Sequence, residues 1–340
     1  MKAIVYHNAG SPDILKLEEI EKPTPGDDEV LIKVRAASVN PIDSGSSRHP
    51  FLRRILFAMS KSKINRPGRD VAGQVEAVGS NVTQFKPGDA VFGLCAGAFA
   101  EYACASQSAL VMKPDNASFE QAASVPLAGL TALQGLRDKG KIRPGQKVLI
   151  NGAAGGVGTF AVQIAKSFGA EVTGVCSTRN VEMVRSIGAD HVIDYTREDF
   201  TKSGKHYDLI FDLVANHSFS ARRRVLKPKG VYIGAGIIGL GESIVRLLIH
   251  QITELVLSRF VSQKFVTLMT KLKQNDLALL GELIEAGRVT PVIDRCYSLS
   301  EVSEAVRYLE QAHAQGKVVI TLETDEDPCK VSSQPILLAH

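Results

Sequence analysis

The stretch 147–158, KVLINGAAGGVG, decides the fold of this chain, because it joins a strand pattern to a helix pattern through glycines. Residues 148–151 predict a short buried strand, and residues 159–170, TFAVQIAKSFGA, have the apolar spacing of a helix. Glycine lets a backbone approach a pyrophosphate closely, and a helix N-terminus offers that group free N–H donors. The stretch therefore predicts a turn that binds a dinucleotide.

The glycine spacing is G-x-x-G-x-x-G rather than the more common G-x-G-x-x-G, so the triplet alone also fits an ordinary glycine-rich turn. A second strand pattern, AEVTGVCS at 170–177, follows the helix at the distance expected of a βαβ unit and favours the dinucleotide site. The residues that we expect around the pyrophosphate are Gly152, Ala154, Gly155, Gly156, Val157 and Gly158.

Length and composition are those of a globular protein with two domains. The 340 residues suffice for two cores, and 44% hydrophobic with 22% charged residues is an ordinary balance. A net charge of +4 on scattered basic residues is too small to indicate nucleic-acid binding, so we expect no nucleic-acid partner.

The cysteines and the N-terminus bear on the cellular compartment. The five cysteines are odd in number and form no C-x-x-C pair, which argues against a disulfide framework. The start, MKAIVYHNAG, has no signal-peptide pattern, and no apolar run reaches the roughly 18 residues of a membrane span. These features fit a reducing compartment, and we expect a cytoplasmic location.

The rest of the chain divides into a β-rich part and an alternating part. Residues 1–115 contain short β-branched runs separated by turn residues, which predicts a compact β domain. A helical pattern covers 118–140, where Ser118 and Gln121 form a capping box. Beyond it, strand patterns alternate with helices, which predicts a parallel sheet covered on both faces. These strand patterns lie at 147–151, 171–176, 191–194, 208–212 and 230–235.

Three further segments have no settled place in this pattern. Residues 44–69 hold seven Lys or Arg and no acid around an apolar centre, and both a lid over a cleft and a patch on an anionic membrane fit them. Residues 243–261 predict an apolar helix that is packed in the protein or at an interface. The tail, 323–340, is expected to lie outside the packed body and to be poorly ordered.

Four motifs carry a family resemblance: MKAIVYHNAGSPDILKLEEIEKPTPGDDEVLIKVRAASVNPID, PGRDVAGQVEAVGSNVTQFKPGDAVFG, AASVPLAGLTALQGL with GQKVLINGAAGGVG, and EAVRYLEQAHAQGKVVI. Over residues 1–322 the chain resembles the zinc-independent quinone oxidoreductase (zeta-crystallin-like) branch of the medium-chain dehydrogenase/reductase superfamily. The resemblance implies an α/β fold with a GroES-like β domain, 1–122 completed by 288–322, and a Rossmann domain with a doubly wound parallel sheet, 123–287. It also implies a homodimer that pairs through the strand at 265–269.

The resemblance bears on metal binding as well. Zinc-dependent members carry Cys where this chain has Asn40, and His-Glu where it has Arg69-Asp70. They also carry a lobe with four closely spaced cysteines, which this sequence lacks. Because a catalytic zinc needs three ligands of the Cys, His or carboxylate type, we expect no metal site.

The residues after the second strand indicate which coenzyme binds. NAD-specific folds usually carry Asp or Glu there for the ribose 2′-hydroxyl, whereas this chain has Cys176-Ser177-Thr178-Arg179. Ser177 can donate to a 2′-phosphate and Arg179 can supply charge, with an ordinary surface arginine as the alternative. The resemblance places Tyr195 at the same phosphate. We therefore expect NADPH rather than NADH.

The resemblance also implies the residues at the substrate end of the cleft. Asn40 would donate a hydrogen bond to a carbonyl, and Asp43 would orient Asn40 or a water, or else make a structural turn contact. Thr131, opening a helical segment, would hold the nicotinamide carboxamide or be an ordinary buried threonine. Lys317 of GKVV could approach the coenzyme, although a lysine at a strand edge is the favoured alternative. The backbone positions expected at the nicotinamide ribose are Gly234 and Gly236.

Two classes of function follow from these expectations. Hydride transfer to an activated acceptor needs orientation and a dry site rather than a nucleophile. The first class is therefore a metal-independent, NADPH-dependent reductase of quinones or α,β-unsaturated carbonyls. The second is a nucleotide-binding adaptor at a membrane surface with little turnover, which rests on 48–69 and 243–261. An alcohol dehydrogenase-like reductase is a weaker third.

Overall fold

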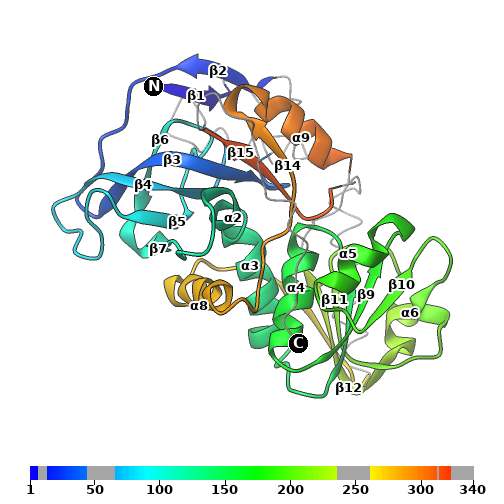
Figure 1. Ribbon diagram of the computed structural model, residues 1–340. Helices are drawn as coiled ribbons and strands as arrows, with labels where there is room; N and C mark the ends of the chain where they lie inside the picture. The colour runs from blue at the N-terminus through cyan, green and yellow to red at the C-terminus, as the bar shows by residue number, and fades with distance from the viewer. Residues whose placement is uncertain (7–13, 44–65, 236–260, 312–313, 323–340) are drawn as a thin grey trace.

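The structure, a computed structural model, describes residues 1–6, 14–43, 66–235, 261–311 and 314–322. Within these ranges two large sheets stand in separate lobes, with α3 (Pro126–Leu133) and α4 (Gly156–Ser167) packed against each other where the lobes meet (Figure 1). Four predictions fall wholly or mostly outside the described residues: the basic segment 44–69, the helix 243–261, the tail and Gly236.

The first large sheet has seven strands, and the C-terminal end of the chain completes it. β15 (Lys317–Thr321) pairs antiparallel with β3 (Glu29–Val39) and parallel with β14 (Ile293–Ser298). The order continues from β3 through β4 and β5 to β7, and β6 also pairs with β3. The bounds of these strands are Asp70–Val78 for β4, Ala90–Leu94 for β5, Tyr102–Ser106 for β6 and Leu110–Met112 for β7.

A helix and a hairpin accompany this sheet. α9 (Val302–Glu310) buries Val302, Ala305 and Val306, whose spacing places them on one helix face, in the same core as residues of β15. The N-terminal strands β1 (Lys2–Val5) and β2 (Lys16–Glu19) pair antiparallel as a separate two-stranded sheet. The predicted GroES-like β domain is thus confirmed, and β15 lies inside its sheet rather than at an edge.

The second large sheet has six parallel strands in the order β10-β9-β8-β11-β12-β13, which is the doubly wound arrangement that the sequence predicts. The strand order reverses between β8 and β11, so the carboxyl ends of these two strands form the usual ligand crevice of such a sheet. The strand bounds are Lys147–Asn151 for β8, Glu171–Cys176 for β9, His191–Asp194 for β10, Tyr207–Asp212 for β11, Leu226–Ala235 for β12 and Lys264–Leu268 for β13.

The predicted helical segment 118–140 is divided into three pieces. In α2 (Phe119–Ala123) the capping box is confirmed, because the Gln121 backbone N–H donates to Ser118 Oγ at 3.1 Å and Gln121 Oε1 accepts from the Ser118 N–H at 2.9 Å. Pro126 then starts α3, since a proline lacks the N–H that a continuing helix would need. A π-helical piece, η3 (Gln134–Lys139), follows.

The remaining helical elements are short, apart from α8, which ends just before Gly287 at φ +66°. Their bounds are Gln107–Ala109 for η2, Thr178–Asn180 for η4, Val181–Ser186 for α5, Phe200–Lys202 for η5, Phe219–Arg224 for α6, Gln274–Glu285 for α8 and Leu299–Glu301 for η6. Among the described helices, none combines the length and the apolar character needed to cross a bilayer.

The cysteines differ in part from the expectation of a reduced protein. Cys95, Cys104 and Cys176 are free. Cys296, on β14, is disulfide-bonded, so the expectation is wrong for this residue. The other cysteines that the structure describes form no disulfide.

Candidate active site

The glycine loop between β8 and α4 has the backbone geometry that only glycine allows. Gly152 has a φ of +88°, in the left-handed region that side chains disfavour. A Cβ on Gly158 would lie 2.0 Å from the carbonyl oxygen of Gly152, far inside van der Waals contact. Gly155 is less restricted, since its nearest neighbour would lie at 3.6 Å. Two of the three glycines are therefore required by the turn itself.

The N-terminus of α4 suits an anionic group. Gly155 is its N-cap residue, and no side chain of the described chain caps the first turn. The first N–H groups of a helix have no partner within the helix, and the helix dipole favours negative charge there. This uncapped turn stands at the carboxyl end of β8, at the switch point of the parallel sheet. Gly152, Ala154, Gly155, Gly156, Val157 and Gly158 thus form a cradle that fits the pyrophosphate of a nicotinamide dinucleotide.

A buried carboxylate that the sequence analysis missed supports the neighbouring loop at the switch point. Asp212 ends β11, and its Oδ1 accepts hydrogen bonds from Asn151 Nδ2 at 2.9 Å and from the N–H groups of Val214 and Ala215 at 3.0 and 2.9 Å. Its Oδ2 accepts from the Tyr232 hydroxyl at 2.9 Å. Asp212 therefore joins the ends of β8, β11 and β12 beside the glycine loop.

The structure brings the predicted 2′-phosphate residues together at the end of β9. The Tyr195 N–H donates to the carbonyl of Cys176 at 3.0 Å, which places Tyr195 beside the segment that contains Ser177 and Arg179. The Tyr195 side chain is exposed, and Asn180 Nδ2 donates to Ser177 Oγ at 3.2 Å. That Ser177, Arg179 and Tyr195 bind a 2′-phosphate stays a prediction.

One acid lies at the same place, and the sequence analysis missed it. Asp194 accepts hydrogen bonds from the Thr178 hydroxyl at 2.6 Å and the Thr196 hydroxyl at 2.7 Å. These bonds, chiefly that from Thr178, lower the pKa of Asp194, so it is charged. Its oxygens are occupied by these neighbours and by Arg197 at 3.5 Å, which limits its repulsion of a phosphate. The residues directly after β9 include no carboxylate, as the sequence shows, but Asp194 on the neighbouring strand β10 supplies one at this end of the sheet.

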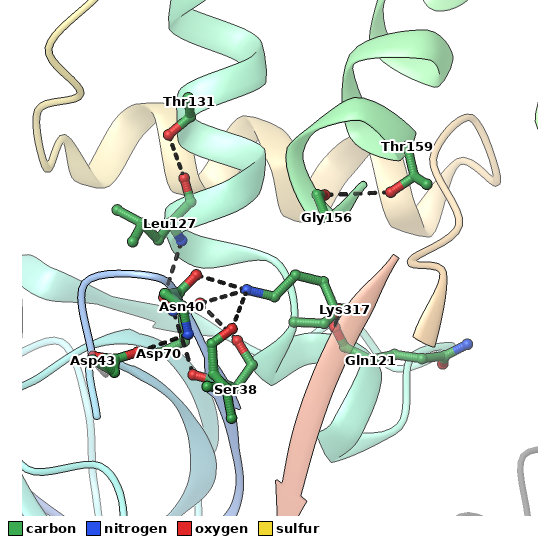
Figure 2. A network of polar contacts seen from close by, with 12 residues as sticks. Ser38, Asn40, Asp43, Asp70, Gln121, Leu127, Thr131, Gly156, Thr159 and Lys317 are labelled. Carbon is green, nitrogen blue, oxygen red and sulfur yellow. Dashed lines mark hydrogen bonds and ion pairs between the residues drawn. The ribbon is translucent and has the colours of Figure 1, made fainter. Parts of the chain in front are cut away.

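At the substrate end, a polar network joins three strands of the seven-stranded sheet (Figure 2). Asp70, at the start of β4, is fully buried, and its Oδ2 accepts from Ser38 Oγ at 2.7 Å and Asn40 Nδ2 at 2.9 Å. Lys317 Nζ, from β15, donates to Asn40 Oδ1 at 2.7 Å and lies 3.4 Å from Asp70 Oδ2. The other oxygen of Asp70 accepts from the Leu127 N–H at 3.0 Å and so holds the start of α3.

The side-chain amide of Asn40 is fully engaged by its neighbours. Its Oδ1 accepts from Lys317, and its Nδ2 donates to Asp70 and, at 3.3 Å, to the carbonyl of Ser38. Donation to a substrate carbonyl would thus require one of these bonds to break. The role expected for Asn40 as a free donor differs from this arrangement, in which it links Lys317 to Asp70.

Asp43 contacts Asn40 through the backbone, which fits the turn contact that the sequence analysis kept as an alternative. Its Oδ2 accepts from the Asn40 N–H at 2.9 Å. Burial, reinforced by the charge of Asp70, raises the pKa of Asp43 to about 7, while the Asn40 bond and the Lys317 charge oppose this shift. Asp43 is therefore a buried acid that titrates near neutrality.

Lys317 corrects the expectation of a strand-edge lysine. Its side chain is only 4% exposed, because β15 lies between β14 and β3. Lys317 and Asp70 share a sequence signal that could have identified them as buried charges. Each stands directly before the apolar run of a strand, in KVVITL and in DVAGQV respectively.

Thr131 and Gly234 are less closely tied to the site. Thr131 lies inside α3 rather than at its start, and its hydroxyl donates to the Leu127 carbonyl at 2.7 Å and contacts Thr270 Oγ1 at 2.8 Å. A contact between Thr131 and the nicotinamide stays a prediction. Gly234 lies near the carboxyl end of β12, where it pairs with Asp212. Gly236 is outside the described residues.

Metal ligands are not gathered in the described part of the chain, where no three His, Cys, Asp or Glu side chains come close enough to hold an ion. Asn40 occupies the position where zinc-dependent members of the resembled superfamily carry a cysteine ligand. Its amide oxygen accepts a hydrogen bond from the ammonium of Lys317. Oxygen bound to a cationic side chain is a poor metal ligand, since the two cations would repel.

Comparison with known proteins agrees with this architecture. Residues 26–115 match the alcohol dehydrogenase GroES-like domain, and residues 187–320 match the family described as zinc-binding dehydrogenase. The chloroplastic quinone-oxidoreductase QR1 of Triphysaria versicolor is 36% identical, over 94% of this chain and 98% of its own length. The chloroplastic NADPH-dependent alkenal/one oxidoreductase of Arabidopsis thaliana is 35% identical, over 94% of this chain and 79% of its own length.

A solved structure shows the same fold over both domains. The quinone oxidoreductase from Coxiella burnetii matches with a TM-score of 0.82 and 32% identity, over 95% of this chain and 99% of its own. These relatives are more than 30% identical and align with nearly the whole chain, so the aligned region includes both large sheets and the residues of the candidate site. The chain belongs to the medium-chain dehydrogenase/reductase superfamily, on the branch of these quinone and alkenal/one oxidoreductases, and it is an oxidoreductase that uses a nicotinamide coenzyme.

Proposed function

We propose that this protein transfers a hydride from NADPH to quinones or α,β-unsaturated carbonyl compounds, without a metal ion. The observation that carries the proposal is the contact between the two halves of the site. Gly316 N donates to the carbonyl of Ala154 in the glycine loop at 2.9 Å, and the next residue, Lys317, reaches Asn40 and Asp70. The coenzyme cradle and the buried polar network therefore adjoin. The relatives that carry these substrates in their names support the substrate class.

The coenzyme supplies a hydride at C4 of its dihydronicotinamide, and the protein supplies position and charge. The uncapped end of α4 would bind the pyrophosphate, while Ser177, Arg179 and Tyr195 would bind the 2′-phosphate. Ser177 and Arg179, together with the engaged state of Asp194, support NADPH over NADH.

The polar network lies where negative charge would develop on the substrate. An activated carbonyl or quinone needs no nucleophile and no Lewis acid of its own, provided that a preorganised polar site stabilises the oxygen that gains the electron pair. Asn40, Asp70 and Lys317 are buried and held by one another, so they keep their orientation without help from solvent. This arrangement supports a metal-independent reaction.

A coenzyme-oxidation screen tests the proposal. Purified protein is mixed with NADPH or NADH and with a panel of benzoquinones, naphthoquinones, alkenals and enones, after dialysis against a chelator and after addition of zinc. We expect oxidation of NADPH with at least one acceptor class and equal rates in the chelated and zinc-treated samples. No turnover with any acceptor would refute the reductase, and a rate that depends on zinc would refute the metal-independent reaction.

We also propose a homodimer that pairs through β13, the edge strand of the parallel sheet, as the resemblance implies. Support comes from Met269, which follows this strand and has 81% of its surface exposed. Sedimentation of the wild type and of a Val266→Pro variant tests it, because a proline in the edge strand blocks pairing. A wild type that sediments as a monomer would refute this assembly. The cytoplasmic location and the contact with a membrane surface stay predictions.

A further inference from the structure

One buried cation stands out in the site. Among the lysines that the structure describes, Lys317 alone is buried. Its ammonium contacts three oxygens: Asn40 Oδ1 at 2.7 Å, the carbonyl of Val39 at 3.3 Å and Asp70 Oδ2 at 3.4 Å. Burying a charge is costly even when it is paired, and an apolar pair of the same size is often at least as stable. A gain in stability alone therefore does not account for this ion pair.

The side chain of Lys317 connects the two halves of the site. Its stem lies against the start of α4, because a Cβ on Gly156 would come within 3.0 Å of Lys317 Cδ. Its ammonium lies in the polar network at the other end (Figure 2). One side chain thus runs from the expected pyrophosphate position to the expected substrate end.

The network holds two carboxyl groups and one cation. Asp70 and Asp43 are both buried, and Lys317 is the cation that faces them. With Asp43 protonated, the charges of Asp70 and Lys317 balance, and the site is neutral before reaction. A neutral, water-poor site with a fixed ammonium stabilises an added negative charge better than water does.

We propose that Lys317 is the positioning residue of the hydride-transfer step: its ammonium fixes Asn40 and Asp70 and offsets the negative charge that reaches the substrate oxygen. The inference rests on the proposed function. In that step the C4–H bond of the coenzyme breaks with its electron pair, and a C–H bond forms at the electrophilic carbon. The π electron pair moves to the substrate oxygen, and a proton from solvent completes the reduction.

The first experiment compares Lys317→Met, which keeps the stem and removes the charge, with Lys317→Arg, which keeps the charge. The matched control is Lys202→Met, at an exposed lysine whose Nζ lies 3.7 Å from Asp199. We expect kcat for the best acceptor to fall about 10²-fold in Lys317→Met, with KM for NADPH changed less than about threefold. Lys317→Arg should recover most of kcat, and the control should match the wild type. A kcat unchanged in Lys317→Met would overturn the proposal.

The second experiment needs no coenzyme and separates charge from packing. The charge of Lys317 opposes the rise in the pKa of Asp43, so its removal raises that pKa further. The stability that depends on neutral Asp43 is complete at low pH and is lost as pH rises through the folded pKa, and this loss is larger when that pKa lies higher. The melting temperature of Lys317→Met should therefore lie further below the wild type at pH 8 than at pH 5. The double variant Lys317→Met, Asp70→Asn should recover melting temperature at pH 8 but not kcat.

These outcomes separate the inference from the function on which it rests. A double variant that regains kcat together with its melting temperature would reduce Lys317 to a structural role and overturn the proposal. If the wild type reduces no acceptor, the proposed function fails. In that case the melting temperatures still test the inference. A fall in melting temperature from wild type to Lys317→Met that is equal at pH 5 and pH 8 would refute a charged role for Lys317, whereas a larger fall at pH 8 would support it.

Discussion

The glycine loop and the polar network at the substrate end are built in opposite ways. The loop spans residues 152–158, is made of backbone, and needs glycine because a Cβ on Gly158 would meet the Gly152 oxygen at 2.0 Å. The network consists of side chains, and Lys317 meets Asn40 across 277 positions of sequence. We therefore expect an added Cβ at Gly158 to disrupt the loop and a lost charge to disrupt the network. The following predictions test this difference, from the largest effect to the smallest.

The largest loss of stability is expected from Asp70→Ala. This change removes the carboxylate that accepts hydrogen bonds from Ser38, Asn40 and Lys317. It also removes the acceptor for the Leu127 N–H at the start of α3. An uncompensated buried ammonium should destabilise the protein by about 3–5 kcal/mol. Urea denaturation followed by circular dichroism measures this loss. The control, Glu182→Ala, removes an exposed ion pair with Arg185 and should change stability by less than about 0.5 kcal/mol. A loss below 1 kcal/mol in Asp70→Ala would mean that the network does not bear on stability.

A smaller loss of stability, with loss of coenzyme binding, is expected from Gly158→Ala. The added Cβ forces the turn to open, at a cost of about 1–3 kcal/mol, and displaces the N–H groups that face the pyrophosphate. Gly281→Ala is the matched control, because its Cβ would lie 3.8 Å from Pro114 in ordinary contact. Titration of NADPH fluorescence should show weak binding in Gly158→Ala and normal binding in the control. Normal binding in both would contradict the cradle.

The third effect depends on pH. The folded pKa of Asp43, about 7, lies above its unfolded value near 4, so the group contributes stability that is complete below pH 4 and is lost as pH rises through 7. Asp43→Asn cannot titrate but keeps an oxygen for the Asn40 N–H. The stability of the wild type relative to this variant should therefore fall between pH 4.5 and pH 8. Asp70 strengthens this shift and Lys317 weakens it. A constant difference across these pH values would show that Asp43 does not titrate there.

The smallest effect concerns the choice of coenzyme. Arg179→Ala should raise KM for NADPH about tenfold and leave KM for NADH unchanged, because only NADPH has the 2′-phosphate that a guanidinium can bind. Arg185→Ala, at a nearby arginine that pairs with Glu182, is the control and should change neither value. Steady-state rates with both coenzymes measure the difference. An equal rise for both coenzymes would count against Arg179 as the phosphate ligand.

The parts that sequence reasoning located well are those in which a local pattern dictates a local structure. Strands β8 to β12, the capping box of Ser118 and Gln121 and the glycine turn follow from spacing within about ten residues. The resemblance added the position of Asn40 and Asp43. Neither kind of inference identified which hydrogen bonds the Asn40 amide makes, because its partners come from other strands.

Sequence reasoning failed for residues whose role depends on whether the fold buries them. Lys317 follows a glycine before an apolar run, and the same letters fit an exposed edge strand or a central one. The pairing of β15 between β14 and β3 buries it. Asp194 and Asp212 were missed for a related reason, since an acid at the end of a strand has no role until the neighbouring strand ends are known.

By itself the sequence determined the order of strands and helices, the glycine turn and the absence of a carboxylate directly after β9, because each depends on residues adjacent in the chain. Only the tertiary structure decided that Asp70, Asn40 and Lys317 share one buried network that touches the glycine loop. The reason is physical: backbone conformation depends on local sterics, whereas the charge and hydrogen bonding of a buried group depend on whatever the fold places around it.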